Sequence, residues 1–495
     1  MVEATSQGYR CDELANTRTR ATPRKQATKV ELTMVDSTSG GGSMPGPRSV
    51  SHRQVSSRNA SLRVAWLVYR GNPHSGGQGV YTRYLARELT SMGHVVDVLS
   101  GQPYPVLDDG VRLIKVASLD LFRSDDPWHI PRLHELRGRK YPDIDALEFA
   151  HMCTSGFPEP LTFSLRARRY LRQNCTDYDL IHDNQCFGYG VAGMQRDGWA
   201  VAATLHHPIT VDRDLEMADA KAHGAGLKRR FSLNRWYGFL GMQIKVARSI
   251  PRIVTVSESS KRDIVAQMGV PAESLHVVPV GVDHQRFRPL AHVIRAPHRV
   301  MTTASADVPL KGLRPLLEAI AKVRTERPVE LLIIGKKREG SILPALLDRL
   351  GLNDIVTFVS AVSDERIVEL YNEATVAVVP SLYEGFSLPA IEAMACGTPL
   401  VTTLGGALPE VVGSDGTAAL TVAPGDAEQL AQAIGRVLDS PELQARLSAG
   451  GRARVLNRFT WRVSAEGTLE QWRLLLEDRE RAAHDGARVT KRVGV

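Results

Sequence analysis

The sequence predicts an α/β protein made of two doubly wound parallel-sheet domains, each Rossmann-like, in tandem. Three observations support this prediction. The chain has 495 residues, enough for two or three domains with full hydrophobic cores. Short apolar runs alternate with stretches of helical periodicity, as in parallel strands joined by helices. The alternation occurs in two series, separated near residues 285–298 by a segment rich in Pro and His, where we expect the inter-domain linker.

The first 60 residues differ from the rest of the chain in composition. They are rich in Ser, Thr, Gly and Arg and include the run SGGGS at residues 39–43. Such a stretch buries too little apolar surface to offset its chain entropy. We therefore expect residues 1–60 to form a disordered basic tail.

The first domain is expected over residues 61–287 and opens with strand, turn, helix and strand. The run LRVAWLVY at residues 62–69 suits a strand that is buried on both faces. The turn GNPHSGGQG follows, then a helix from Val80 that stops at Gly93, then the strand VVDVLS at residues 95–100. Thr82 stands where a dinucleotide-binding fingerprint would need its last glycine, which argues against NAD. Further strands are predicted at residues 179–183, 201–207 and 252–257.

The second domain is expected over residues 298–458. Its strands are predicted at residues 299–305, 329–335, 355–360, 376–381 and 399–403. A C-terminal helix, at about Val463 to Arg481 within residues 459–482, and a flexible tail at residues 483–495 complete the predicted organisation.

Composition excludes several other classes of protein. The five cysteines are scattered, with no C-x-x-C pair, so neither a disulfide framework nor a zinc site is indicated and a reducing cytoplasm is expected. No apolar run reaches the ~18–20 residues of a membrane span. The net charge of +8 is divided as +4 over residues 1–60, +5 over 61–290 and −1 over 291–495. With no recognisable nucleic-acid motif, this charge gives no reason to expect a nucleic-acid partner.

The segment PSLYEGFSLPAIEAMACGTPLV, at residues 380–401, has the densest chemical signal. Glu384 lies just beyond a predicted buried strand, at the edge where ligands dock in open α/β sheets, and Glu392 follows eight residues later on a predicted helix. Backbone N–H groups at the start of that helix can hold a diphosphate. The two carboxylates can accept hydrogen bonds from sugar hydroxyls.

This segment resembles the E-x₇-E region of the retaining glycosyltransferases of family four (glycosyl transferases group 1), which have the GT-B architecture. The stretch from Val254 to Pro289, the run KGLRPLLEA from Lys311 and the FTW at residues 459–461 are similar to the same family. The resemblance covers nearly all of residues 62–480. It implies two domains that face each other across a cleft, with the donor mainly on the C-terminal domain, the acceptor mainly on the N-terminal one, and a last helix that crosses back.

Carried over residue by residue, the resemblance gives roles to the C-terminal domain. Glu384 would bind the transferred sugar and Glu392 the donor ribose, while Lys311 would be the cation on the leaving diphosphate. A fixed ammonium at that place stabilises the charge that develops as the glycosidic bond breaks. The remaining expected donor-binding residues here are Gly385, Phe386, Ser387 and Leu388 at the diphosphate and Ser360 near the base.

In the N-terminal domain, Gly76 and Gly77 match the glycine pair that lets donor phosphate and acceptor approach the backbone. His206 matches a histidine at a strand end near the transferred sugar, and with Lys311 and Glu384 it completes the expected catalytic set. Asp183 and Asn184 are acceptor contacts by position alone.

The resemblance implies transfer of a sugar from a nucleotide-diphosphate sugar to a hydroxyl of a glycolipid, glycan or small molecule. Retention without a recognised side-chain nucleophile implies same-face attack, with the leaving phosphate helping to deprotonate the acceptor. No metal or other cofactor is expected, and no D-x-D pair follows a strand. Two alternatives stay open: an inactive nucleotide-sugar-binding or scaffolding protein, and a GT-B epimerase or phosphorylase.

Two features of the sequence leave alternatives. Ser305 and Ala306 stand where the family usually has an arginine, and Lys336, Lys337 and Arg338 either supply that charge or form a solvated loop. The stretch from Lys228 to Arg248 mixes six Lys/Arg with aromatic residues. It either lies peripherally on an anionic membrane or packs its aromatic face into the domain. The oligomeric state is not indicated.

Overall fold

A computed structural model describes residues 60–72, 77–120, 140–174, 177–222, 226–303, 309–335 and 343–493. All but the last residue of the predicted tail at 1–60 lies outside these ranges. Within them, no helix is both long and apolar enough to span a bilayer.

The N-terminal sheet has seven parallel strands in the order β3-β2-β1-β4-β5-β6-β7. The strand order reverses between β1 and β4, which makes their carboxyl ends the topological switch point where ligands bind in open α/β sheets. The strands are β1 (Arg63–Val68), β2 (Val95–Ser100), β3 (Arg112–Lys115), β4 (Leu180–Asn184), β5 (Val201–Thr204), β6 (Arg252–Thr255) and β7 (Leu275–Val277).

Helices pack on both faces of this sheet. On one face Leu85 and Leu89 of the first helix pack with Trp66, and on the other Phe163 and Leu171 pack with Ile181. The helices are α1 (Gln78–Ser91), α2 (Pro142–Cys153), α3 (Glu159–Asn174), α4 (Tyr189–Arg196), α5 (Thr210–Ala222), α6 (Leu227–Trp236), α7 (Leu240–Ala247) and α8 (Glu258–Met268), with 3₁₀ turns η2 (Tyr237–Phe239) and η3 (Ala272–Ser274).

The C-terminal sheet has six parallel strands in the order β10-β9-β8-β11-β12-β13. They are β8 (Arg299–Thr303), β9 (Glu330–Ile334), β10 (Val356–Val359), β11 (Val376–Val379), β12 (Leu400–Thr403) and β13 (Leu420–Val422). The helical elements of this part are η4 (Pro309–Lys311), α9 (Leu313–Glu326), α10 (Leu343–Leu350), α11 (Asp364–Glu373), α12 (Leu388–Ala395), α13 (Leu408–Val412), α14 (Ala427–Asp439) and α15 (Pro441–Arg458). The predicted fold class is confirmed.

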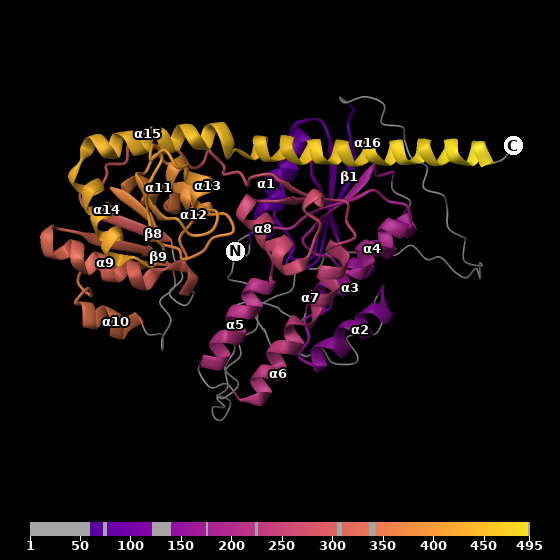
Figure 1. The fold of residues 1–495 in the computed structure, drawn as a ribbon, viewed down its shortest axis with the longest axis horizontal. Helices are drawn as coiled ribbons and strands as arrows, with labels where there is room; N and C mark the ends of the chain where they lie inside the picture. The colour runs from indigo at the N-terminus through magenta and orange to yellow at the C-terminus, as the bar shows by residue number, and fades with distance from the viewer. Residues whose placement is uncertain are drawn as a thin grey trace, which may run out of the picture.

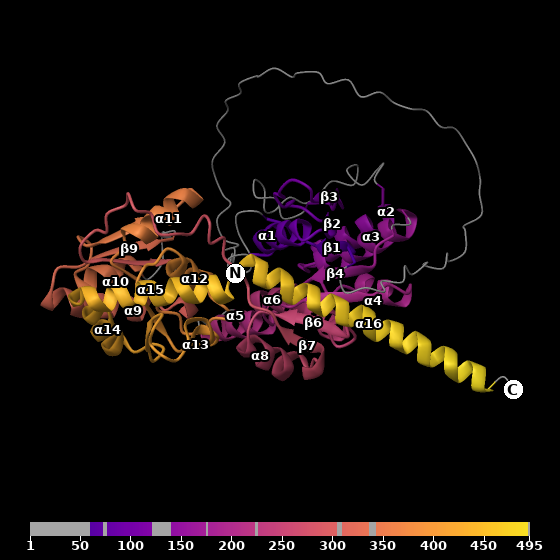
Figure 2. The same cartoon turned by 90° about the horizontal axis from the view of Figure 1, so that it is seen from above.

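The last helix, α16 (Trp461–Val493), returns to the N-terminal domain. Figures 1 and 2 show it running on from α15 and lying across α1 and the first sheet. Trp472 is fully buried against Trp66 and donates a hydrogen bond to His182 of β4. Residues 483–493, where a tail was expected, are helical and form the last part of α16.

The linker between the two sheets is held by the start of α16. The backbone of Val282 pairs with Phe459 and Thr460, and Ser464 donates a hydrogen bond of 2.6 Å to the carbonyl of Pro279. A Cβ on Gly281 would lie 2.4 Å from the amide nitrogen of Trp461, so only glycine permits this approach. The two domains are therefore joined by packed chain at this crossing.

Candidate active site

Lys311 and Glu384 form an ion pair at the carboxyl edge of the C-terminal sheet. Lys311 ends η4, Glu384 lies in the loop after β11, and their Nζ and Oε1 atoms are 2.8 Å apart. Ser381 donates a second hydrogen bond, of 2.7 Å, to the same carboxylate oxygen. The two segments are tied together by their backbones, since the N–H of Leu382 donates to the carbonyl of Leu310 at 2.7 Å. Sequence reasoning placed Lys311 and Glu384 at one site, and the structure brings them into contact.

The loop after Glu384 leads into the amino terminus of α12. Gly385 and Phe386 precede Ser387, which is the N-cap, and Leu388 is the first helical residue. Phe386 is buried, with its ring 5.8 Å from that of Phe459. The hydroxyl of Ser387 is buried, and among the described residues it has no hydrogen-bond partner and does not cap the helix. A helix start whose cap hydroxyl is unused is suited to an anionic group.

Glu392 lies in the second turn of α12, beside Tyr371 of α11. The Tyr371 hydroxyl donates a hydrogen bond of 3.1 Å to its carboxylate. Burial raises the pKa of Glu392 to about 7, and the Tyr371 hydrogen bond opposes that shift. The carboxylate is thus held near the carboxyl end of β8, because Tyr371 also lies 3.4 Å from the Thr303 hydroxyl.

His206 follows β5 in the N-terminal domain and is buried. Its Nε2 lies 2.9 Å from Asn184 Oδ1, and its backbone N–H donates to Gln185 Oε1 at 2.8 Å. Burial, followed by the neighbouring His207, lowers the pKa of His206 to about 3. The imidazole is therefore neutral at physiological pH.

Asp183 and Asn184, predicted as acceptor contacts, are both fully buried in β4. The Asn184 side chain bonds within the protein, to α1 and to His206. Asp183 Oδ2 accepts from the N–H of Phe187 at 2.8 Å, and burial raises the pKa of its carboxyl to about 7. Direct contact of either residue with the acceptor substrate stays a prediction.

The two domains touch at the amino terminus of α8. Ser257 and Ser260 donate hydrogen bonds of 2.6 and 2.9 Å to the carbonyl of Gly385, and the hydroxyl of Tyr383 bonds the Asp263 carboxylate. A Cβ on Gly385 would lie 3.5 Å from the Cβ of His207. The loop of residues 384–387, which we call the donor loop because the resemblance assigns it to the donor, therefore lies beside the strand end that carries His206.

Glu410 of α13 completes this contact between the domains. Its carboxylate accepts from the N–H groups of Glu258 and Ser259 at 2.7 and 2.8 Å. Sequence reasoning missed Ser257, Ser260 and Glu410. The sequence offered two signals for these residues: two serines three residues apart after a strand, and a glutamate in the first turn of a short helix. Neither signal identifies a partner in the other domain.

Two further predicted residues are described by the structure, and the others are not. Gly77 is the N-cap of α1 with φ of 71°, a conformation that favours glycine. Ser360 is exposed directly after β10, at the edge of its sheet. Gly76 lies outside the described residues, as do Ser305, Ala306, Lys336, Lys337 and Arg338.

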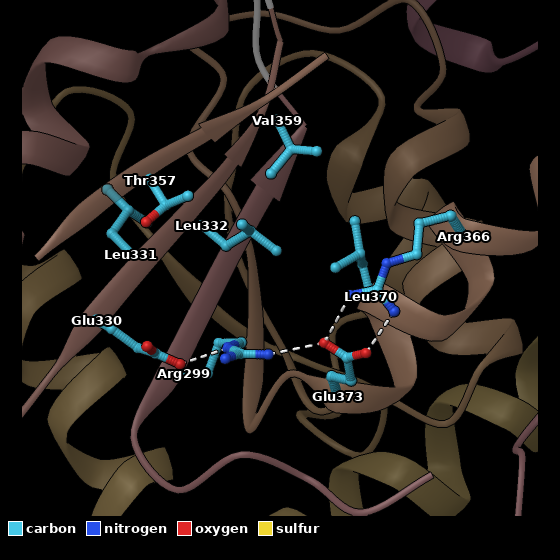
Figure 3. A pocket seen from close by; sticks show the side chains of 9 residues that line it. All are labelled: Arg299, Glu330, Leu331, Leu332, Thr357, Val359, Arg366, Leu370 and Glu373. Carbon is cyan, nitrogen blue, oxygen red and sulfur yellow. Dashed lines mark hydrogen bonds and ion pairs between the residues drawn. The ribbon is translucent and has the colours of Figure 1, made fainter. Parts of the chain in front are cut away.

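The C-terminal domain also has a cavity of about 250 Å³ between its sheet and α11 (Figure 3). Arg299 pairs there with Glu330 and Glu373, and Glu373 also pairs with Arg366. The guanidinium groups are thus already neutralised, and none of the predicted site residues that the structure describes lines this cavity.

The stretch from Lys228 to Arg248 folds as α6, η2 and α7, not as one amphipathic helix. Trp236 and Phe239 lie 5.0 and 5.1 Å from the ring of Phe157, and Tyr237 is buried, so these aromatic side chains pack into the domain. Phe231 is 69% exposed beside the exposed Arg229 and Arg230. Membrane contact by that remaining surface stays a prediction.

The site therefore offers an ammonium group, a helix amino terminus and two carboxylates on one domain, with a neutral imidazole close by on the other. A cation and helix amides suit an anionic leaving group, and carboxylates suit hydroxyl groups.

Comparison with known proteins agrees with this chemistry. The family model described as "Glycosyl transferases group 1" matches residues 291–454, and that described as "Glycosyltransferase Family 4" matches residues 75–286. An MMP alpha-(1->4)-mannosyltransferase of Mycolicibacterium hassiacum is 49% identical over 409 residues, which cover 82% of this chain and 97% of the relative. A D-inositol 3-phosphate glycosyltransferase of Acidothermus cellulolyticus is 29% identical over 481 residues, covering 91% and 99%.

Solved structures show the same fold. Sucrose-phosphate synthase of Thermosynechococcus elongatus superposes with a TM-score of 0.62 at 24% identity, covering 84% of this chain and 100% of that one. Anabaena HepE in complex with UDP and glucose gives a TM-score of 0.59 at 18% identity, covering 83% and 98%. Both likenesses are of fold alone.

Proposed function

This chain belongs to the family-four glycosyltransferases of group 1, and we propose that it is a retaining mannosyltransferase which uses a nucleotide-diphosphate mannose and forms an α-(1→4) linkage to a hydroxyl acceptor. The sugar and linkage rest on the relative named as an α-(1→4)-mannosyltransferase, which is 49% identical over 97% of its length. Nucleotide-diphosphate mannoses carry their sugar in the α configuration, so an α product means retention.

The contact between Lys311 and Glu384 is the observation that carries the proposal. In the ligand-free protein the two charges satisfy each other at 2.8 Å. A bound donor would draw the Lys311 ammonium to its diphosphate, and Glu384, still held by Ser381, would accept hydrogen bonds from the sugar hydroxyls. The pair thus keeps both groups in place before the donor arrives.

Departure of the diphosphate is the step that these groups assist. Negative charge grows on the phosphate as the anomeric bond breaks, and Lys311 with the N–H groups at the start of α12 stabilises it. The acceptor hydroxyl attacks from the same face, and its proton passes to the leaving phosphate. Because a lysine and helix amides supply the stabilisation, we propose that no metal ion is required, so activity should survive chelation by EDTA.

The cleft between the domains is where this chemistry is proposed to occur. Ser257 and Ser260 hold the carbonyl of Gly385, so the donor loop is fastened to the N-terminal domain beside His206. The acceptor would approach from that domain. We propose a glycan as acceptor, with a mannosyl glycan as the first to be tested, ahead of a glycolipid or a small molecule, because a (1→4) linkage joins the transferred sugar to O4 of an acceptor sugar.

A thermal-shift panel of GDP-, UDP- and ADP-mannose followed by a transfer assay tests the proposal. One nucleotide sugar should raise the melting temperature, since a ligand of the folded state stabilises it by mass action. Lys311→Met should then lower kcat by roughly 10²- to 10³-fold, the usual effect of losing one group that stabilises a developing anion.

Lys322→Met is the matched control, because Lys322 is half-exposed on α9 and pairs only with Glu428 among the described residues. Wild-type protein that binds a nucleotide sugar but transfers nothing to any mannosyl acceptor would support the alternative, an inactive binding protein. Equal activity of Lys311→Met and wild type would overturn the assigned mechanism.

A further inference from the structure

A buried polar cluster surrounds His206 at the carboxyl ends of β4 and β5, under α1. His206 is 3% exposed and Asn184 is fully buried. The His206 Nε2 atom faces Asn184 Oδ1 at 2.9 Å. Its other ring nitrogen, Nδ1, is buried, and no hydrogen-bond partner for it lies among the described residues. A buried ring nitrogen without a hydrogen-bond partner is unusual, because most buried polar atoms are paired.

The contacts of Asn184 decide which way its amide group points. The Nδ2 atom lies 3.1 Å from Thr82 Oγ1 and 3.4 Å from the carbonyl oxygen of Gln78, both on α1. A carbonyl oxygen only accepts, so the amide nitrogen must face α1. The oxygen of the amide is thereby left for His206.

The orientation of Asn184 in turn decides where His206 carries its proton. An amide oxygen only accepts, so Nε2 must be the protonated ring nitrogen. In the neutral imidazole Nδ1 then has a lone pair and no hydrogen. The titratable groups that face His206 are His182, His207 and Tyr81, while the neighbouring Asp183 points to the opposite face of β4. No carboxylate among the described residues therefore bonds His206 and favours its charged form.

His182, in the same cluster, provides an internal comparison. It also has Nε2 on a protein partner, the hydroxyl of Thr204 at 2.8 Å. Its Nδ1 accepts a hydrogen bond of 2.9 Å from the indole N–H of Trp472 on α16. An indole nitrogen only donates, so His182 has the same tautomer with its acceptor satisfied. Of these two buried histidines, it is His206, at the strand end next to the donor loop, whose Nδ1 has no hydrogen-bond partner among the described residues.

We propose that Asn184 is a positioning residue of the transfer reaction, which holds His206 in the Nε2–H tautomer so that Nδ1 accepts a hydrogen bond from a hydroxyl group of the transferred sugar. The substrate part of this inference rests on the proposed function. A site of this kind selects a neutral sugar with a hydroxyl at that place. It disfavours a deoxy sugar, which leaves Nδ1 unpaired, and a carboxylate, whose oxygens would face a lone pair.

The tautomer is tested first, without catalysis, by NMR of ligand-free protein labelled with ¹⁵N only in histidine. His206→Gln identifies the His206 signals. We expect a neutral ring protonated on Nε2, and we expect Asn184→Asp to raise the pKa of His206, because a carboxylate beside Nε2–H favours the imidazolium form. Protonation of wild-type His206 on Nδ1 would overturn the proposal, whatever the enzyme is found to transfer.

The substrate part is tested with nucleotide-diphosphate mannoses that each lack one hydroxyl. One analogue should lose roughly 10- to 100-fold in kcat/KM with wild-type enzyme, the expected effect of leaving a buried acceptor unpaired. In His206→Phe that same analogue and the full donor should be used equally well. If wild type and His206→Phe use every analogue with the same relative efficiency, the proposed contact with a sugar hydroxyl is wrong. If wild type transfers no sugar at all, the result counts against the proposed function and leaves the NMR result standing.

The role of Asn184 is separated from simple support of the fold by the pH profile. Asn184→Asp should add an acidic limb to kcat/KM, since protonated His206 no longer accepts at Nδ1. Asn372→Asp is the matched control, because Asn372 is a buried amide of α11 that bonds Leu290 and Arg288 far from the cluster. An Asn184→Asp profile that coincides with those of wild type and Asn372→Asp would refute the positioning role.

Discussion

Glu410 should control how firmly the two domains close on each other. It lies in α13 of the C-terminal domain, and its two carboxylate oxygens accept from two adjacent N–H groups at the start of α8 in the N-terminal domain, at 2.7 and 2.8 Å. The N-cap of α8, Ser257, is already used by the N–H of Ser260 at 2.9 Å. The carboxylate therefore supplies acceptors for other free N–H groups of this helix end, and only when the domains are together.

The change in the free energy of domain closure can be worked out for the replacement of Glu410 by Gln. The amide keeps one acceptor oxygen, loses the charge that favours a helix amino terminus, and turns its NH₂ group toward the second backbone N–H. Hydrogen bonds to a charged group contribute about 1.5–3 kcal/mol each, and water competes for a half-buried carboxylate when the domains part. We expect a net loss of about 1–2 kcal/mol, a roughly 5- to 30-fold shift toward the open form.

Small-angle X-ray scattering with and without the nucleotide sugar measures the closure, and kcat/KM should fall by a similar factor. Asp426→Asn is the matched control. Asp426 also accepts from two N–H groups at a helix start, those of Glu428 and Gln429 in α14, but within one domain. Because Asn caps a helix about as well as Asp, Asp426→Asn removes the same charge and should change neither closure nor stability appreciably. Scattering curves of Glu410→Gln that match wild type at every donor concentration would refute the reasoning.

Three further predictions concern backbone strain and titration. Gly312 has φ of 66° and a Cβ there would lie 1.9 Å from the carbonyl oxygen of Pro380, so Gly312→Ala should displace the neighbouring Lys311 and lower kcat at least about tenfold. Gly351→Ala, at φ of 64° with open space around the Cβ, should lower the melting temperature without this kinetic effect; equal kinetics of the two variants would contradict the prediction. Because burial raises the pKa of Glu392 to about 7, donor affinity measured by calorimetry should weaken as the pH falls from about 8 to about 6, and Glu392→Gln should bind weakly with no such dependence. Burial lowers the pKa of His182 to about 3, so below pH ~6.5 only the unfolded chain takes up that proton and wild type loses stability. In denaturant unfolding, the stability difference between wild type and His182→Gln should therefore shrink as the pH falls from ~6.5 to ~5, with a slope that approaches about 1.4 kcal/mol per pH unit, and a constant difference would show that His182 is not buried as a neutral ring.

The strands that the sequence predicts well are those covered on both sides. β1, β2, β4 and β11 read as short apolar runs because helices pack on both faces of a parallel sheet. The edge strands β3, β7 and β13 were missed. They have three or four residues, and several of their side chains are partly exposed, so no apolar run marks them.

The length of α16 was also underestimated. Its apolar positions face the N-terminal domain as far as Leu475 and Leu476, and the prediction stopped soon after them. The helix continues to Val493, through a stretch rich in Ala and Arg, which have high helix propensity without forming an apolar stripe.

By itself the sequence determined the fold class, because apolar runs, helical periodicity and the start of a helix after a strand are local patterns. Its motifs resemble one family, and that resemblance indicated the family and the residues proposed to carry the chemistry, among them Lys311 and Glu384. Tertiary structure alone decided the contacts that give those residues their state. Gly385 is held by serines more than a hundred residues away, Glu410 reaches a helix of the other domain, and His206 takes its proton position from Asn184. These contacts depend on how the two domains meet and on how β4, β5 and α1 pack together. No local sequence pattern specifies that geometry.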